Sequence, residues 1–240
     1  NRGGDYAAGE RIATQAIDSI DGAETASVGD ALGSALMVRA VSRSAEGAYD
    51  KATDDFAAAR AALTTTGNVR TLALVDSNFA LMQMERDRFH DAVDGLARSV
   101  DYFHRLGAPI RELLDRNKLA ACHLALLDYA AAAADDADLA DLAMRVEDPE
   151  VRSDARRRRA EIAFALGRTV DAESMVRELL AGPELSDVVR GPVLLLDAKL
   201  AMARGDAAGA ATSARSALAL KWDEDDPRAY ATTWLVLARA

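Results

Sequence analysis

A three-residue motif recurs along this chain at a nearly constant spacing, and that spacing constrains the fold more than any other feature. The third residue of the motif, which we call the anchor, lies at positions 6, 49, 89, 129, 169 and 207. Successive anchors are therefore 43, 40, 40, 40 and 38 residues apart. A small residue follows each anchor by three positions, at Gly9, Ala52, Ala92, Ala132, Ala172 and Ala210. An alanine precedes each of the last five anchors by nine positions, at Ala40, Ala80, Ala120, Ala160 and Ala198. Matches at fixed offsets along the whole chain indicate a structural repeat.

The two small-residue columns predict close helix crossings. Antiparallel helices joined by a tight turn approach closely only where small side chains face each other. An apolar stripe at helical spacing runs through the second helix of each pair, and it is broken by Ser99 and Asp136. The chain is therefore expected to be all-α, with the recurring motif at the turn inside each helical hairpin.

Glycine, proline and capping residues place the helix ends between these columns. They predict helices at 5–20, 27–46, 49–65, 69–86, 89–106, 110–127, 129–145, 149–166, 170–181, 186–203, 206–220 and 227–240. Gly191-Pro192 falls inside the tenth of these helices, where a kink or a late start is expected.

The columns resemble the tetratricopeptide repeat. Its first-helix pattern is matched best by Trp234-Leu235-Val236-Leu237-Ala238, and its second-helix pattern by Gly47-Ala48-Tyr49 and Gly205-Asp206. The first-helix leucine position is degenerate, with Arg39, Phe79, Leu119, Arg159 and Asp197. The resemblance implies a right-handed α-solenoid of about six antiparallel helix pairs in a single domain over 1–240. A period near 40 resembles the elongated repeats of bacterial signalling and regulatory proteins.

Composition and charge narrow the function classes. The formal net charge of −10 argues against a nucleic-acid-binding surface. No apolar run is long enough to cross a membrane, and a single cysteine excludes a disulfide framework. Nucleophile-elbow, phosphate-loop, zinc-protease and dinucleotide motifs are absent from the sequence. We therefore expect no enzyme and no cofactor, and a location in the cytoplasm.

A few clusters could carry chemistry, and each has a plainer interpretation. Cys122 and His123 are adjacent on a helix and point about 100° apart, so a packed thiol beside a packed histidine is favoured over a catalytic pair. His90 and His104 are read as surface or packing residues. The acidic runs, Asp135-Asp136-Asp138-Asp141 and Asp223-Glu224-Asp225-Asp226, lack the calcium-loop pattern and are read as solvated charge rather than metal ligands.

The run Arg156-Arg157-Arg158-Arg159 is the strongest charge feature. Four consecutive helical residues splay over every face, so at most two or three of them reach one ligand. A solvated, salt-bridged helix is the plainer interpretation. The alternative is an anion or carboxylate site.

The resemblance favours a non-catalytic scaffold that binds a peptide, a helix or another domain of the same polypeptide in a concave groove. In tetratricopeptide arrays the first helix of each pair lines that groove. The resemblance therefore implies groove residues at fixed distances from the alanine at each helix crossing. The expected exposed groove residues are Ser77, Leu81, Met84, Asn117, Leu124, Arg157, Glu161, Phe164, Lys199 and Met202. Arg157 is the expected charged anchor. The alternative function is a switch domain that binds a small-molecule or anionic effector and controls an attached output domain.

Both ends of the sequence fall inside a repeat. The chain opens in a second helix and closes in a first helix, without an initial methionine, so it is expected to be a fragment of a longer protein. Solenoids need polar caps at their ends. Self-association through an end, with Trp234, Leu235 and Leu237 partly open, is therefore a further expectation.

Overall fold

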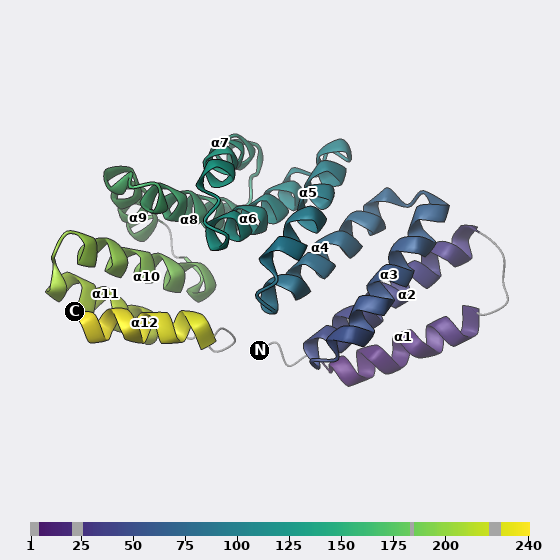
Figure 1. Ribbon diagram of the computed structural model, residues 1–240. Helices are drawn as coiled ribbons and strands as arrows, with labels where there is room; N and C mark the ends of the chain where they lie inside the picture. Colours follow the sequence, from purple (N-terminus) through teal and green to yellow (C-terminus); the bar gives the residue numbers. More distant parts are fainter. Residues whose placement is uncertain (1–4, 21–25, 183–184, 221–226) are drawn as a thin grey trace. The chain divides into compact units, whose positions relative to one another are not determined.

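The computed structural model describes residues 5–20, 26–182, 185–220 and 227–240. Within these ranges every regular element is an α-helix (Figure 1). The helices are α1 (Tyr6–Ile20), α2 (Ala26–Ala45), α3 (Tyr49–Thr66), α4 (Val69–Glu85), α5 (Phe89–Arg105), α6 (Pro109–Ala125), α7 (Tyr129–Arg145), α8 (Pro149–Ala165), α9 (Thr169–Ala181), α10 (Asp187–Ala203), α11 (Ala207–Leu218) and α12 (Pro227–Arg239).

Every helix predicted from the sequence is present, and no boundary differs by more than about two residues. The expected late start at Gly191-Pro192 is wrong, because α10 begins at Asp187 and continues through Pro192. Pro192 lies in the second turn of α10, so its missing N–H removes a single bond, to the carbonyl of Val188. The acidic run 223–226 lies outside the described residues.

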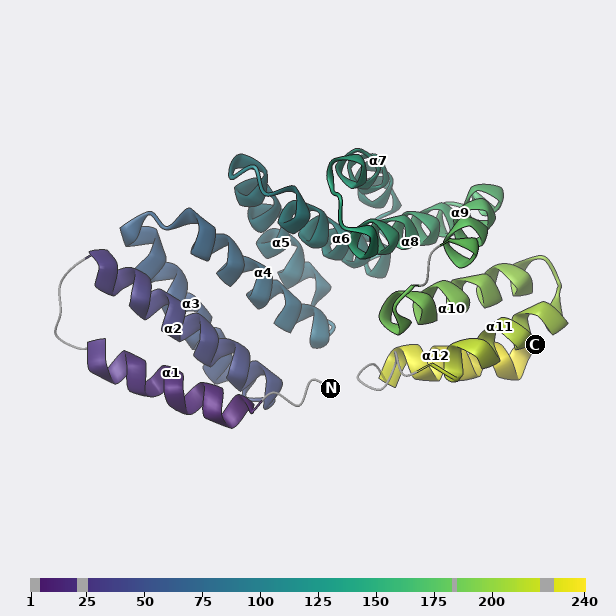
Figure 2. The ribbon, with the colours of Figure 1, turned by 180° about the vertical axis from the view of Figure 1, so that it is seen from behind.

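The alanines of the two small-residue columns lie where neighbouring helices cross. Both sets of alanines, nine residues before and three residues after the anchors, are fully buried with 0% exposure from Ala40 to Ala210. Consecutive helices pack against each other, as α2 does on α3, α4 on α5 and α10 on α11 (Figure 2). The predicted register is therefore confirmed.

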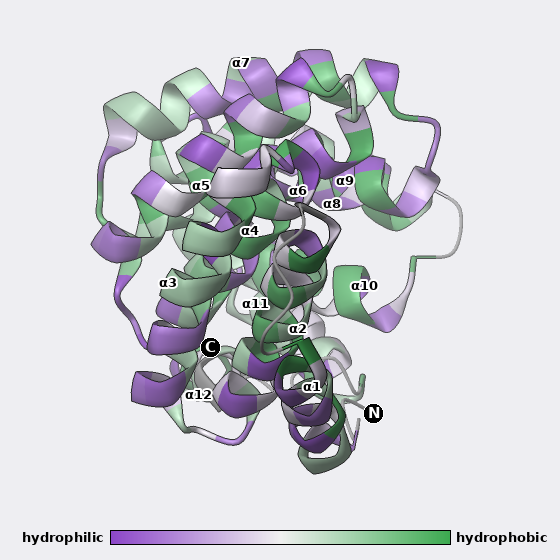
Figure 3. Cartoon of the chain, turned by 90° about the vertical axis from the view of Figure 1, so that its right-hand side faces the viewer, coloured by the Kyte–Doolittle hydropathy of each residue, from purple (hydrophilic) through white to green (hydrophobic). Residues whose placement is uncertain are grey.

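The chain divides into two compact units, one ending at Asp115 and the other beginning at Arg116, with the boundary inside α6. Phe56, Leu63 and Val75 centre one core cluster of the first unit, where Phe56 meets Phe79 edge-on at 5.8 Å between ring centroids. The second unit has a cluster that includes Val176 and Leu200. The visible helices each carry hydrophobic and hydrophilic residues (Figure 3), as expected for helices that bury one side.

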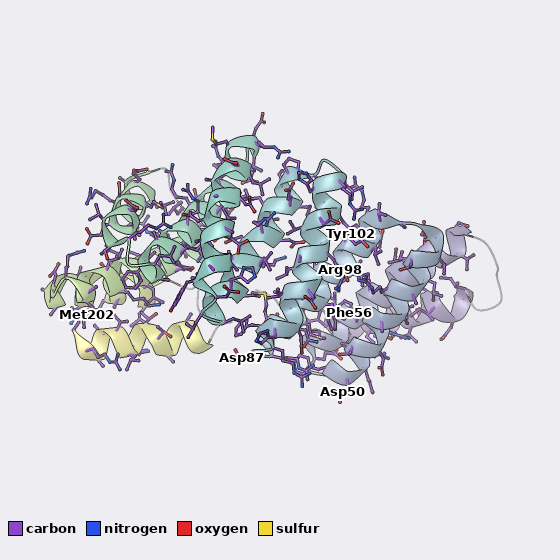
Figure 4. The ribbon with its side chains drawn as sticks, turned by 45° about the horizontal axis from the view of Figure 1, so that its top comes forward. Asp50, Phe56, Asp87, Arg98, Tyr102 and Met202 are labelled. Carbon is purple, nitrogen blue, oxygen red and sulfur yellow. The ribbon has the colours of Figure 1, made fainter. Side chains whose placement is uncertain are left out.

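The turn inside each hairpin is the same structure in five repeats. The residue two positions before the anchor has a positive φ, at Gly47 (78°), Asp87 (60°), Leu127 (58°), Gly167 (75°) and Gly205 (80°). The next backbone N–H then bonds a carbonyl five residues back, as Arg88 does to Gln83 at 2.9 Å. This is the left-handed helix ending that favours glycine. Asp87, labelled in Figure 4, and Leu127 adopt it without being glycine.

Candidate functional site

A half-open pocket of about 430 Å³ lies in the second unit on the first helices of three consecutive pairs. It is lined by Phe164 of α8, by Lys199, Met202 and Ala203 of α10, and by Thr232, Leu235, Val236 and Arg239 of α12. We call it the α8–α10–α12 pocket; Met202 is labelled in Figure 4. Three of the ten residues predicted for the groove, Phe164, Lys199 and Met202, line it.

The pocket combines an apolar wall with two cationic side chains. Phe164 and Met202 are half-buried, and Leu235 is 50% exposed. Lys199 and Arg239 form no ion pair with any residue that the structure describes. Such a surface is suited to an apolar segment that also carries carboxylates.

A charged network lies on the same side of α8 as Phe164. Its members Arg157 and Glu161 precede Phe164 by seven and three residues, so they lie on the same face of the helix. Arg157 donates to Asp154 Oδ1 from Nε at 2.8 Å and to Glu161 Oε1 from Nη1 at 2.7 Å. Arg158 donates to Asn117 Oδ1 at 3.0 Å and to Glu161 Oε2 at 2.5 Å, while the Asn117 amide donates to Asp154. The positive charges of the two arginines are thus balanced by the negative charges of the two carboxylates, Asp154 and Glu161.

This network changes the interpretation of Arg157. Only 8% of Arg157 is exposed, and its guanidinium is occupied by two carboxylates, so its expected exposure as a charged anchor is wrong. Burial disfavours its charge, but the charges of Glu161 and Asp154 prevail and raise the pKa of Arg157. For Glu161, burial is outweighed by Arg158, Arg157 and Lys199, which lower its pKa. The network holds α6 to α8.

The remaining predicted groove residues differ in exposure. Ser77 and Asn117 are 8% and 6% exposed, so their expected exposure is also wrong. Ser77 donates to Asp115 Oδ1 at 2.7 Å, which satisfies its hydroxyl inside the first unit. Leu81 and Met84, also in that unit, and Leu124 in the second unit are half-buried.

The interpretation of the acidic run on α7 is wrong for its first two residues. Asp135 and Asp136 are 3% and 7% exposed instead of solvated. His123 Nδ1 lies 2.6 Å from Asp135 Oδ2, and Asp136 accepts from Arg159 and Arg168 at 2.7 and 2.8 Å. Burial raises the pKa of Asp135 although His123 and Arg116 oppose it. Both carboxylates belong to the helix packing.

Cys122 and His123 do not form a catalytic pair in this arrangement. The thiol is fully buried, burial raises its pKa to about 11, and His123 is directed to Asp135. The nucleophilic thiolate form is therefore disfavoured at neutral pH. His90 is exposed, and His104 Nδ1 lies 3.0 Å from Glu112 Oε1. Nowhere in the described ranges do three or more metal-ligating side chains gather.

Sequence reasoning missed the buried carboxylates of the first unit. Asp55 accepts from Arg39 at 2.9 and 2.7 Å and from Arg43 at 2.7 Å. Asp76 pairs with Arg60 and Arg98, and Asp115 accepts from Ser99 at 2.5 Å. One available signal was Arg39 itself, since a charge at the first-helix leucine position requires a partner.

Comparison with known proteins identifies the fold. No protein-family model and no curated protein matches this chain. Among solved structures, BtubC (BKLC) from P. vanneervenii aligns with a TM-score of 0.70 at 14% identity, covering 93% of each chain. PilF of Pseudomonas aeruginosa aligns with a TM-score of 0.59 at 15% identity, covering 98% of this chain and 97% of the other. A tetratricopeptide repeat protein from Parabacteroides merdae gives 0.49 at 13% identity, covering 97% and 93%.

None of the described helices is long and apolar enough to cross a bilayer. The regular helical hairpins, the buried alanine columns and the first two structural matches agree with each other. The fold class that the resemblance implied is confirmed: the described part of the chain is an all-α array of antiparallel helix pairs.

Proposed function

We propose that this chain is a non-catalytic protein-interaction scaffold whose α8–α10–α12 pocket binds an apolar segment of a protein partner that carries acidic side chains. The observation that carries the proposal is the pairing, in one pocket, of Phe164 and Met202 with Lys199 and Arg239. Half-exposed aromatic and methionine side chains suit an adaptable apolar contact, because methionine fills irregular shapes. The two cations select carboxylates on the partner.

The buried network beside the pocket supports this role. Arg157, Arg158, Asp154 and Glu161 satisfy one another, so the charged side chains on this side of α8 are already paired beside Phe164. A binding side chain held on such a helix loses little freedom when the partner binds. Binding would then require only small rearrangements of the pocket.

Selection of random peptides on the protein tests this proposal. A phage-displayed peptide library would be selected on the full chain, and the enriched peptides would be measured by fluorescence anisotropy. We expect apolar peptides with Asp or Glu, whose affinity falls about tenfold or more in Phe164→Ala and Lys199→Glu. Lys51→Glu makes the same charge reversal at an exposed position of α3 and should leave affinity unchanged. Enriched peptides that bind both pocket variants as well as the wild type would refute the proposal.

We also propose the wider setting implied by the elongated repeats, a regulatory part of a longer bacterial signalling protein acting in the cytoplasm. Another domain of that polypeptide is then a natural source of the apolar acidic segment. Self-association is a competing use of the same residues, because Leu235 and Trp234 are 50% and 49% exposed on α12. Light scattering across a concentration series distinguishes the two: a mass independent of concentration excludes self-association.

We also propose a second function, the binding of a small anionic effector, for a different group of residues on α8 that includes Arg152 and Arg156.

A further inference from the structure

The four consecutive arginines of α8 divide between two faces of that helix. Arg157 and Arg158 belong to the network with Asp154 and Glu161. Arg156 and Arg159 lie on the other face, and Arg152 joins them because residues spaced by three and four positions share a face. The four arginines therefore belong to two different sites, two to the charged network and two to the other face.

The second face lines a cavity of about 510 Å³, which we call the arginine pocket. Its lining comes from α7, α8 and α9 and consists of Ala140, Ala143, Met144, Pro149, Arg152, Ser153, Arg156, Arg159 and Leu179. Three cations and no carboxylate appear in this lining, although the whole chain carries a net charge of −10. A cavity of this volume is in the range of small-molecule sites, about 300–1,000 Å³.

The arginines of this pocket are only partly neutralised. Arg152 is exposed and has no ion-pair partner among the described residues. Arg156 reaches Glu178 at 3.3 Å through an exposed pair, 49% and 57% accessible, and exposed ion pairs of this kind are weak. Arg159 shares the single carboxylate of Asp136 with Arg168, so that group of three retains one positive charge.

Two acidic residues at the start of α8 are engaged elsewhere. Asp148 Oδ1 accepts from the backbone N–H groups of Glu150 and Val151 at 2.9 and 3.1 Å as the helix cap. Glu150 Oε1 accepts from the Ser186 hydroxyl at 2.5 Å. Neither carboxylate pairs with Arg152.

The rest of the lining is apolar and partly open. Ala140 and Ala143 form the α7 wall, and Leu179 of α9 is buried beside them. Met144 is 87% exposed at the edge of the pocket, an unusual exposure for a large apolar side chain. A ligand that fits both parts has an apolar body and an acidic group.

We propose that the arginine pocket binds a small organic anion, whose carboxylate or phosphate group pairs with Arg152 and Arg156 while its apolar part lies against Ala140, Ala143 and Leu179. Guanidinium groups bind either acidic group through paired N–H donors. This site is lined by different residues of α8 from those of the α8–α10–α12 pocket, so the proposal does not depend on the scaffold function. Its natural role would be that of an effector site.

Calorimetric titration of the full chain with three matched probes tests the proposal. The probes are phenylpentanoate, phenylpentyl phosphate and phenylpentanol, which share one apolar body and differ in the end group. At least one of the two anions should bind about tenfold or more tightly than the alcohol, and the tighter anion identifies the preferred acidic group. Equal binding of all three, or binding of none, would overturn the proposal.

Variants locate the binding. Arg152→Gln and Arg156→Gln should each weaken the preferred anion about tenfold. Ala143→Phe, which fills the apolar part, should abolish binding while circular dichroism shows the helices intact. Arg111→Gln is the matched control, because Arg111 is also exposed in the first turn of a helix that begins with proline. Anion affinity that is unchanged in both arginine variants would place the ligand elsewhere and refute the site.

Discussion

Arg159 donates from Nε to Asp136 Oδ1 at 2.7 Å, and Asp136 stands at a position where neighbouring repeats carry apolar side chains. Asp136 occupies the position of Phe56, Leu96 and Val176, whereas Arg159 occupies a position that is apolar in Phe79 and Leu119 but charged in Arg39 and Asp197. The charge of Asp136 on α7 is therefore neutralised by an arginine of α8 across a helix contact. Such a pair costs desolvation but avoids the larger penalty of a lone buried charge.

This relationship predicts a thermodynamic cycle. Asp136→Leu restores the apolar pattern on α7 but leaves Arg159 and Arg168 without their carboxylate, so we expect a loss of about 1–3 kcal/mol in the free energy of unfolding. The double variant Asp136→Leu/Arg159→Leu should recover most of that loss, because it removes the arginine left without a partner and puts apolar side chains on both sides of the contact. Urea denaturation of the two single variants and the double variant measures the coupling. Additive losses in the double variant would contradict the compensation.

The helices were predictable because their signals are local. Apolar spacing, turn and capping residues and the alanine columns act within one hairpin, and they predict every helix end correctly to about two residues. Even Pro192, which lies inside α10, disturbs only one hydrogen bond near the start of that helix.

The fate of the charged residues was not predictable from one helix alone. Phe164, Lys199 and Met202, which the register predicted for the groove, line one pocket, yet the same register predicted an exposed Arg157. The ion pairs of Arg157 with Asp154 and Glu161 lie within α8 and follow from their spacing of three and four residues. The Asn117–Arg158 bridge joins α6 to α8, and the His123–Asp135 contact joins α6 to α7. The sequence of one helix does not determine these contacts between helices.

The buried alanine columns predict a strong effect of side-chain size at a crossing. Ala120 is fully buried in α6, so Ala120→Leu adds three heavy atoms where no space exists and should cost about 1–3 kcal/mol. Ala133→Leu, at an exposed position of α7, is the matched control and should change stability by less than about 0.5 kcal/mol. Thermal denaturation of both variants measures the difference. An unchanged midpoint for Ala120→Leu would refute the register.

The turn between α6 and α7 predicts a stabilising substitution. Leu127 has a φ of 58° and is 66% exposed, whereas Gly47, Gly167 and Gly205 hold the same turn position in other repeats. Leu127→Gly removes the left-handed penalty of a residue with a Cβ, so we expect a gain of about 0.5–1 kcal/mol. Leu127→Ala loses the same exposed side chain but keeps the Cβ, and it should show no such gain. If both variants melt alike, the strain assigned to this turn is absent.

The buried thiol of Cys122 predicts a loss of stability in alkali. Burial is the largest cause that raises the pKa of Cys122 from 9.0 to about 11; Arg158 opposes this shift and Asp135 adds to it. Between these two values the unfolded chain releases the thiol proton while the folded chain keeps it. The contribution of this thiol to the free energy of unfolding is therefore complete below pH 9. About 1–3 kcal/mol of it is lost as the pH rises to about 11.

Tyrosines and lysines titrate in the same range, so Cys122→Ala serves as the reference in which only the thiol is missing. The difference in unfolding free energy between wild type and Cys122→Ala should fall by that amount from pH 8.5 to pH 11 in urea titrations, with reductant present. A difference that stays constant over this range would show that the folded and unfolded thiols ionise alike.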